Sequence, residues 1–151
     1  MFERILVPVD GSPHARRAVD VALELAQCHG ASVFLIHVVR DLALPKEIRD
    51  MIAAGEITAP PMQILKDSAD IILSQARRAF ERAGFADVQA ECLMGDPAAE
   101  ILHYAAQHEV DLIVIGHRGL GPHEGFLGGV ARKLVNITRI SCLIVTDPGG
   151  N

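Results

Sequence analysis

Residues 112–129 read LIVIGHRGLGPHEGFLGG, an apolar run followed by a segment that carries six glycines between Gly116 and Gly129. Four large aliphatic residues in succession, Leu112–Ile115, are typical of a strand that is covered on both faces of a sheet. Glycine permits positive φ and lets the backbone come close to another group. The segment is therefore either a long turn or a loop that wraps the phosphates of a ligand, and the pattern alone leaves both open.

Four more β-rich runs accompany this one, at Ile5–Val9, Val33–Val39, Val88–Leu93 and Cys142–Val145. The run at Val88–Leu93 alternates apolar and polar residues, as a strand near a sheet edge does. The other three are almost continuously apolar, which predicts strands buried on both faces.

Helical patterns separate these runs. Ser12 and Pro13 supply an N-cap and a proline at the first helical position, and Gly30 supplies a stop signal. Further helices are expected at about 62–83, 96–108 and 128–138, with a short one near 45–54 inside the irregular stretch 40–61. This alternation predicts right-handed βαβ units, and hence a mostly parallel sheet with helices on both faces, in one α/β domain spanning 1–151.

Composition excludes several classes of partner. A net charge of −5, scattered basic residues, no Trp and a single Tyr argue against nucleic acid. The sequence has no apolar run of the roughly 18 residues that a membrane span needs, and its start lacks the pattern of a signal peptide, so we expect a cytoplasmic protein. Cys28, Cys92 and Cys142 are widely spaced and are expected to be small buried hydrophobic residues.

In a parallel α/β sheet, ligands bind beyond the carboxyl ends of the strands, where the strand order reverses. Asp10 directly follows the run Ile5–Val9 and can either accept a hydrogen bond from a ribose hydroxyl or cap the turn into the helix. The segments 37–40 and 94–97 lie at the ends of the second and third β-rich runs, so we expect them at the same edge of the sheet as Asp10. Neither a Walker-type phosphate loop nor a G-x-G-x-x-G after the first strand is present in the sequence.

The glycine segment ends at Gly128 and Gly129, at the head of the last predicted helix, where unpaired N–H groups and the helix dipole favour an anion. His117 and Arg118 lie at its start. His117, His123 and Glu124 do not match a common zinc spacing, so we expect no metal held by side chains alone.

The remaining histidines are interpreted structurally. His37 is expected to be a hydrogen-bonded core residue, and the others are expected to lie on helix surfaces (His14, His29, His103 and His108). The sequence contains no G-x-S-x-G nucleophile motif and no evident catalytic pair.

The pieces together resemble the universal stress protein family over essentially the whole chain. The resemblance is carried, in order, by ILVPVDGSPHARRAVDVALELA (5–26), LIHVV (35–39), MGDPAAEIL (94–102), DLIVIGHRGLG (111–121) and GGVARKLVNITRISCLIV (128–145).

This resemblance implies a five-stranded parallel sheet in the order 3-2-1-4-5, ATP bound through a G-x2-G-x9-G-[S/T] pattern, and homodimers that pair their last strands, here Cys142, Leu143, Ile144 and Val145. ADP or AMP could replace ATP, and Mg²⁺ could be held by the phosphates together with Asp10. The resemblance places Val9 and Asp10 against base and ribose, Val38 and Ile115 around adenine, and Gly116 and Gly119 at the first phosphate turn. The predicted nucleotide site in full is Pro8, Val9, Asp10, Val38, Ile115, Gly116, His117, Arg118, Gly119, Gly128, Gly129 and Val130.

The second half of the motif departs from the family pattern. Counted with a nine-residue spacer, Val130 stands at the Ser/Thr position, and with an eight-residue spacer Gly129 does. The hydroxyl is missing in either alignment, although backbone N–H groups there can still bind phosphate. A nucleotide-binding regulatory dimer is therefore the first hypothesis. A dimeric interaction protein of the same fold without a nucleotide is the second, and a slow ATP hydrolase is the third.

Overall fold

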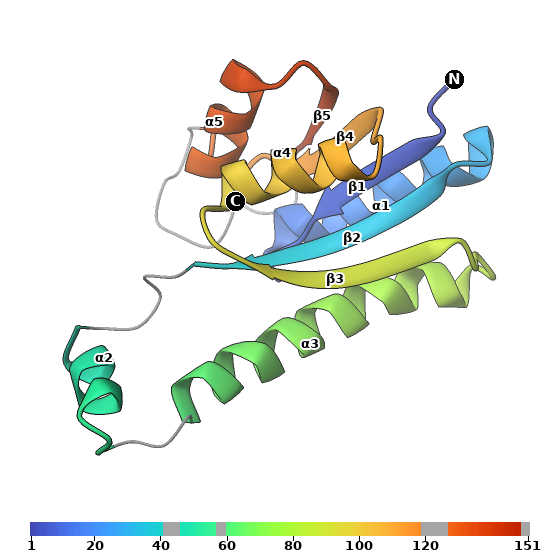
Figure 1. Ribbon diagram of the computed structural model, residues 1–151. Coiled ribbons are helices and arrows are strands. Elements are labelled where there is room, and N and C mark those ends of the chain that lie inside the picture. Colours follow the sequence, from blue (N-terminus) through green and yellow to red (C-terminus); the bar gives the residue numbers. More distant parts are fainter. Residues whose placement is uncertain (41–45, 57–59, 119–126, 149–151) are drawn as a thin grey trace.

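The computed structural model describes residues 1–40, 46–56, 60–118 and 127–148, with strands and helices following one another along the chain (Figure 1). The strands are β1 (Arg4–Pro8), β2 (Ser32–Val39), β3 (Val88–Met94), β4 (Leu112–Gly116) and β5 (Ser141–Val145). The helices are α1 (Pro13–His29), α2 (Lys46–Ala53), α3 (Pro60–Arg82), α4 (Pro97–Gln107) and α5 (Gly129–Ile137). Every predicted element is present, and its ends lie within two residues of the prediction.

The five strands form one parallel sheet in the order β3-β2-β1-β4-β5, which confirms the expected α/β fold. β1 lies at the centre and pairs with β2 over Arg4–Pro8 and with β4 at Ile5 and Leu6. The chain moves outward from β1 through β2 to β3, then returns to β4 on the other side. The strand order therefore reverses at β1, and a crevice is expected beyond the carboxyl ends of β1 and β4.

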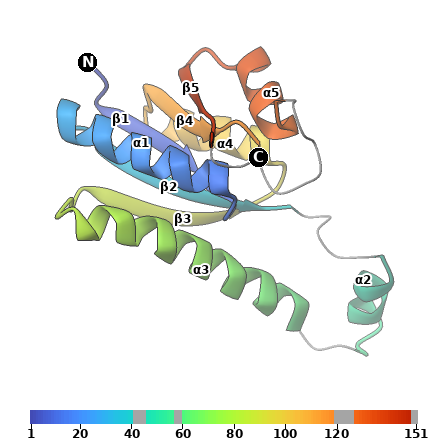
Figure 2. The ribbon, with the colours of Figure 1, turned by 180° about the vertical axis from the view of Figure 1, so that it is seen from behind.

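Helices cover both faces of this sheet, as Figures 1 and 2 show from opposite sides. α1 and α3 pack on one face around a cluster that includes Val7, Ala22 and Phe80. α4 and α5 pack on the other around a cluster that includes Ile101 and Leu134. With both faces covered, most residues of β1, β2 and β4 are buried, which explains their almost continuous apolar sequence.

Local capping sets where two of these helices begin. Ser12 Oγ accepts a hydrogen bond from the Ala15 N–H at 3.1 Å, and Asp96 Oδ2 accepts one from the Ala99 N–H at 3.1 Å. Each cap is followed by a proline whose fixed φ suits the first helical position. Each cap lies within four residues of the end of a strand, so both helices begin at the same edge of the sheet as the crevice.

The expectation that β5 is buried on both faces is wrong. β5 is an edge strand, and its first four residues alternate between exposed and half-buried, with Leu143 38% exposed and only Val145 buried. The apolar run does not distinguish a central strand from an edge strand. The strand order decides this, because β5 has a neighbour on one side within the sheet.

The burial of four side chains also differs from the sequence prediction. Cys28 and Cys92 are exposed, because Cys28 lies off the buried stripe of α1 and Cys92 lies on the edge strand β3. Cys142 is half-buried, and burial raises the pKa of its thiol. His14, expected on a helix surface, is buried, and its Nδ1 accepts a hydrogen bond from the Asp147 N–H at 3.2 Å.

Among the described helices, none has the combination of length and apolar character that a membrane-spanning segment requires. The irregular stretch 40–61 contains the expected short helix, α2, while residues 41–45 and 57–59 lie outside the described ranges.

Candidate functional site

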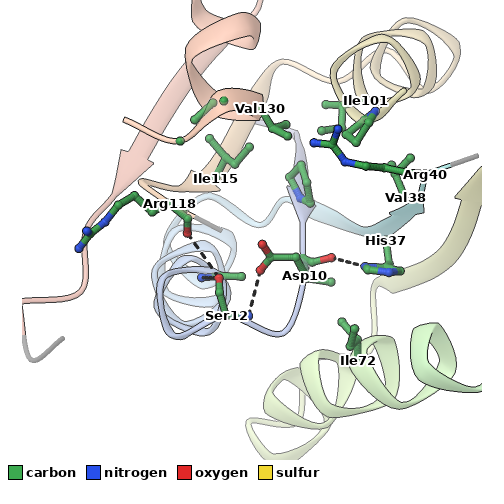
Figure 3. Close-up of a pocket in the computed structure, with 18 residues that line it drawn as sticks. Asp10, Ser12, His37, Val38, Arg40, Ile72, Ile101, Ile115, Arg118 and Val130 are labelled. Atoms are coloured by element: carbon green, nitrogen blue, oxygen red, sulfur yellow. Dashed lines mark hydrogen bonds between the residues drawn. The ribbon is translucent and has the colours of Figure 1, made fainter. Parts of the chain in front are cut away.

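A cavity of about 550 Å³ lies beyond the carboxyl ends of β1, β2 and β4 (Figure 3). This size is within the usual range for a pocket that holds a small molecule, roughly 300–1,000 Å³. Val38, Ile115 and Val130 give it an apolar part, and Asp10 gives it a carboxylate. The N-termini of α4 and α5 contribute as well, through Pro97 and through Gly128–Ala131.

The turn between β1 and α1 places Asp10 in this cavity. The Ser12 N–H donates to Asp10 Oδ1 at 2.9 Å, and Gly11 takes a positive φ of +82°. The sequence left a choice between a turn cap and a ligand contact for Asp10. The turn bond engages one carboxylate oxygen, and Asp10 also lines the cavity, so both roles are compatible.

Gly116, the last residue of β4, is required by packing. A Cβ built there would lie 2.8 Å from the carbonyl carbon of His14 and 3.0 Å from the Ala15 nitrogen. Both atoms belong to the backbone of α1, so a side chain at Gly116 would push the helix away. The glycine allows the first turn of α1 to pack against β4, which brings the β1–α1 turn beside the cavity.

The N-terminus of α5 forms the opposite wall. Gly128 is its N-cap and so offers no side-chain acceptor to the first N–H groups, and the first turn contains no acidic residue. An ideal Cβ on Gly129 would meet nothing within 4 Å. Unpaired N–H groups at a helix N-terminus carry partial positive charge, so this wall can bind an anion.

Charged side chains also lie at this edge of the sheet, in the cavity lining and close to it. Arg40 lines it, and in Figure 3 its guanidinium lies toward Ile101 of α4. Lys133 Nζ lies 3.4 Å from Asp96 Oδ2 and links the second turn of α5 to the N-cap of α4. The pKa of Asp96 is lowered, first by the hydrogen bond from the Ala99 N–H and then by Lys133 and Arg40, so this carboxylate stays ionised.

Comparison with known proteins identifies the family. The universal stress protein family model matches residues 1–146. The chain belongs to the universal stress protein family. It is 32% identical to universal stress protein YxiE of Bacillus subtilis over 96% of this chain and 99% of that protein.

Two solved universal stress proteins share the fold. One is a complex with cAMP, with a TM-score of 0.70 and 24% identity over 95% of this chain and 97% of that one. The other, from Archaeoglobus fulgidus in complex with dAMP, has a TM-score of 0.63 and 23% identity over 96% of this chain and 98% of that one.

Most of the residues predicted for the nucleotide site of this universal stress protein do surround one cavity. The lining includes all of them except His117 and Gly119, and Gly119 lies outside the described residues together with His123 and Glu124. The His117 ring lies 6.0 Å from that of His14, away from the lining. In Figure 3, Arg118 lines the cavity near its backbone, while its side chain extends away from Ile115.

Several lining residues were not predicted. Ser12, Arg40 and Pro97 lie in the segments that follow β1, β2 and β3, so the rule that ligands bind beyond strand ends is the sequence signal for them. Ile72 and Ile101 come from the middle of helices, where an apolar residue that faces a cavity has the same sequence signal as one that faces the core. In the described part of the chain, no three side chains of the metal-binding types gather at one point.

Replacing Gly116 with alanine is expected to destabilise the protein by about 1–3 kcal/mol, the usual cost of overpacking, because the new Cβ would collide with the backbone of α1. Urea unfolding followed by circular dichroism measures the effect. Gly129→Ala is the matched control and should change stability by less than about 0.5 kcal/mol, since its Cβ meets open space. Equal stabilities for the two variants would contradict this account of Gly116.

Proposed function

We propose that this universal stress protein binds an adenine nucleotide in the cavity beyond β1 and β4 and acts as a regulatory homodimer in a stress response. The observation that carries the proposal is the meeting of three kinds of group around one cavity. These are apolar side chains, a carboxylate at the end of β1, and a helix N-terminus free of acidic residues.

Each part of the cavity suits one part of the nucleotide. Val38 and Ile115 offer an apolar slot for the base. Asp10 can accept hydrogen bonds from ribose hydroxyls, and the N–H groups at the start of α5 can receive phosphate oxygens. The cAMP and dAMP complexes of the two solved relatives support this choice of ligand. When Mg²⁺ accompanies the nucleotide, the phosphates and Asp10 are the oxygen ligands at hand, and the ion would neutralise phosphate charge.

ATP, ADP and AMP, each with Mg²⁺, are expected to bind the nucleotide-stripped protein at micromolar concentrations in calorimetric titration. Asp10→Ala should weaken ATP binding by roughly tenfold or more, because hydrogen bonds to a charged group contribute about 1.5–3 kcal/mol. Asp20→Ala, which removes an exposed carboxylate from α1, is the matched control and should leave the affinity unchanged. Absence of heat with all three nucleotides would contradict the proposal and favour an interaction protein of the same fold.

The missing hydroxyl at the start of α5 gives a second test. Gly129→Ser is expected to raise ATP affinity by roughly two- to tenfold, the range for one neutral hydrogen bond, and to affect AMP less. The open space around Gly129 accommodates the new side chain. Gly129→Ala separates the hydroxyl from the added carbon. Equal ATP affinities for the serine and alanine variants would show that a hydroxyl here does not reach the phosphates.

The position of β5 at the edge of the sheet supports the proposed dimer. Its outer edge presents backbone groups that can pair with another strand, and Leu143 exposes an apolar side chain beside them. Leu143→Glu is expected to shift the protein from dimer to monomer in sedimentation velocity, because pairing about a two-fold axis would bury the charge. Ile71→Glu, at a more exposed position on α3, is the control and should remain dimeric. An unchanged sedimentation coefficient for Leu143→Glu would place the interface elsewhere.

A further inference from the structure

We propose that His37 is a positioning residue of the nucleotide site, which holds Asp10 toward the ribose by anchoring the backbone carbonyl of Val9. The inference rests on the proposed function, since it assigns a role in the same cavity. His37 comes from β2 and Asp10 from the β1–α1 turn, so the role depends on a contact between neighbouring strands.

The contact itself is short and has a defined direction. His37 Nδ1 lies 2.7 Å from the Val9 carbonyl oxygen, and this bond is drawn in Figure 3. A carbonyl oxygen only accepts, so the imidazole must carry its proton on Nδ1 and donate it. The tautomer therefore follows from the partner, and a donor on β2 fixes a carbonyl beyond the end of β1.

Val9 is held at both of its backbone groups. Its N–H donates to the Ile36 carbonyl at 2.8 Å, which continues the β1–β2 pairing, and its carbonyl accepts from His37. Val9 is 6% exposed. A carbonyl there that lost its donor would be left poorly solvated, and the backbone would rotate to find another partner.

That rotation would move Asp10, because the peptide that joins Val9 to Asp10 contains this carbonyl. Downstream, the Ser12 N–H holds Asp10 Oδ1 at 2.9 Å, and Ser12 is itself fixed as the N-cap of α1. Two contacts therefore set the position of the Asp10 carboxylate: His37 holds the Val9 carbonyl that precedes it, and Ser12 holds its Oδ1 atom. Loss of the hydrogen bond from His37 to the Val9 carbonyl would therefore affect the contact between Asp10 and the ribose more than the apolar slot formed by Val38 and Ile115.

His37 also lines the cavity, so a direct contact with the ligand is the competing explanation. The two explanations differ in whether the effect of His37 on affinity depends on Asp10. A residue that acts through Asp10 has no effect on affinity once that carboxylate is removed, whereas a residue that touches the ligand keeps its effect. A double-mutant cycle separates these cases.

The experiment compares binding of ATP with that of 2′,3′-dideoxy-ATP, which lacks both ribose hydroxyls, by calorimetry. His37→Leu is expected to lower the affinity ratio of ATP to the dideoxy analogue by roughly two- to tenfold, with little change for the analogue. His37→Asn, whose side-chain N–H lies near the position of Nδ1, should retain the ratio. His37→Leu in an Asp10→Ala background should bind ATP as Asp10→Ala alone does.

Equal losses for both nucleotides, additive effects in the cycle, or failure of asparagine to restore the ratio would each overturn the inference. His37→Met provides a second variant without a donor if the leucine variant does not fold, as judged by thermal unfolding. A wild-type protein that binds no adenine nucleotide would overturn the proposed function, and this inference with it. Normal wild-type binding with an unchanged ratio in His37→Leu would overturn this inference alone.

Discussion

The packing of the first turn of α1 against the end of β4 is the contact on which the site depends. A Cβ at Gly116 would come within 3 Å of the α1 backbone, so the helix approaches the strand as closely as only glycine allows. This approach places the β1–α1 turn beside the end of β4. The same turn carries Asp10 and Ser12, and a displacement of α1 would therefore separate the carboxylate from the rest of the cavity.

Beyond that contact, the cavity combines rigid walls with a polar rim. The carboxyl end of β1 pairs with β2, that of β2 with β3 and that of β4 with β5, and α5 is joined to the start of α4 by the ion pair between Asp96 and Lys133. That pair is exposed and contributes little to stability. The backbone dipole of α5 is present whatever side chains surround it, so the helix start can attract phosphate without the hydroxyl that the family pattern provides.

The glycines of residues 116–129 do not share one purpose. Gly116 is a packing residue, while Gly128 and Gly129 leave space around a helix N-terminus that faces the cavity. Close packing at Gly116 is a third explanation for a glycine in this segment, beside the turn and the phosphate-binding loop between which the sequence left a choice. A count of glycines does not reveal this difference, because the steric demand on Gly116 comes from α1, which is far away in sequence, and Gly129 meets no such demand.

The sequence by itself determined the alternation of strands and helices, the N-cap at Ser12, the start of a helix near Asp96 and, through the family resemblance, most of the cavity lining. The elements and the cap depend on local preferences, whereas the lining follows from the rule of parallel topology together with the resemblance to the family. Only the tertiary structure decided that β5 is exposed, that Cys28 and Cys92 lie at the surface, that His14 is buried, and that His37 donates to Val9. Each of these depends on which elements become neighbours in space, and an apolar pattern in the sequence does not say which elements those are.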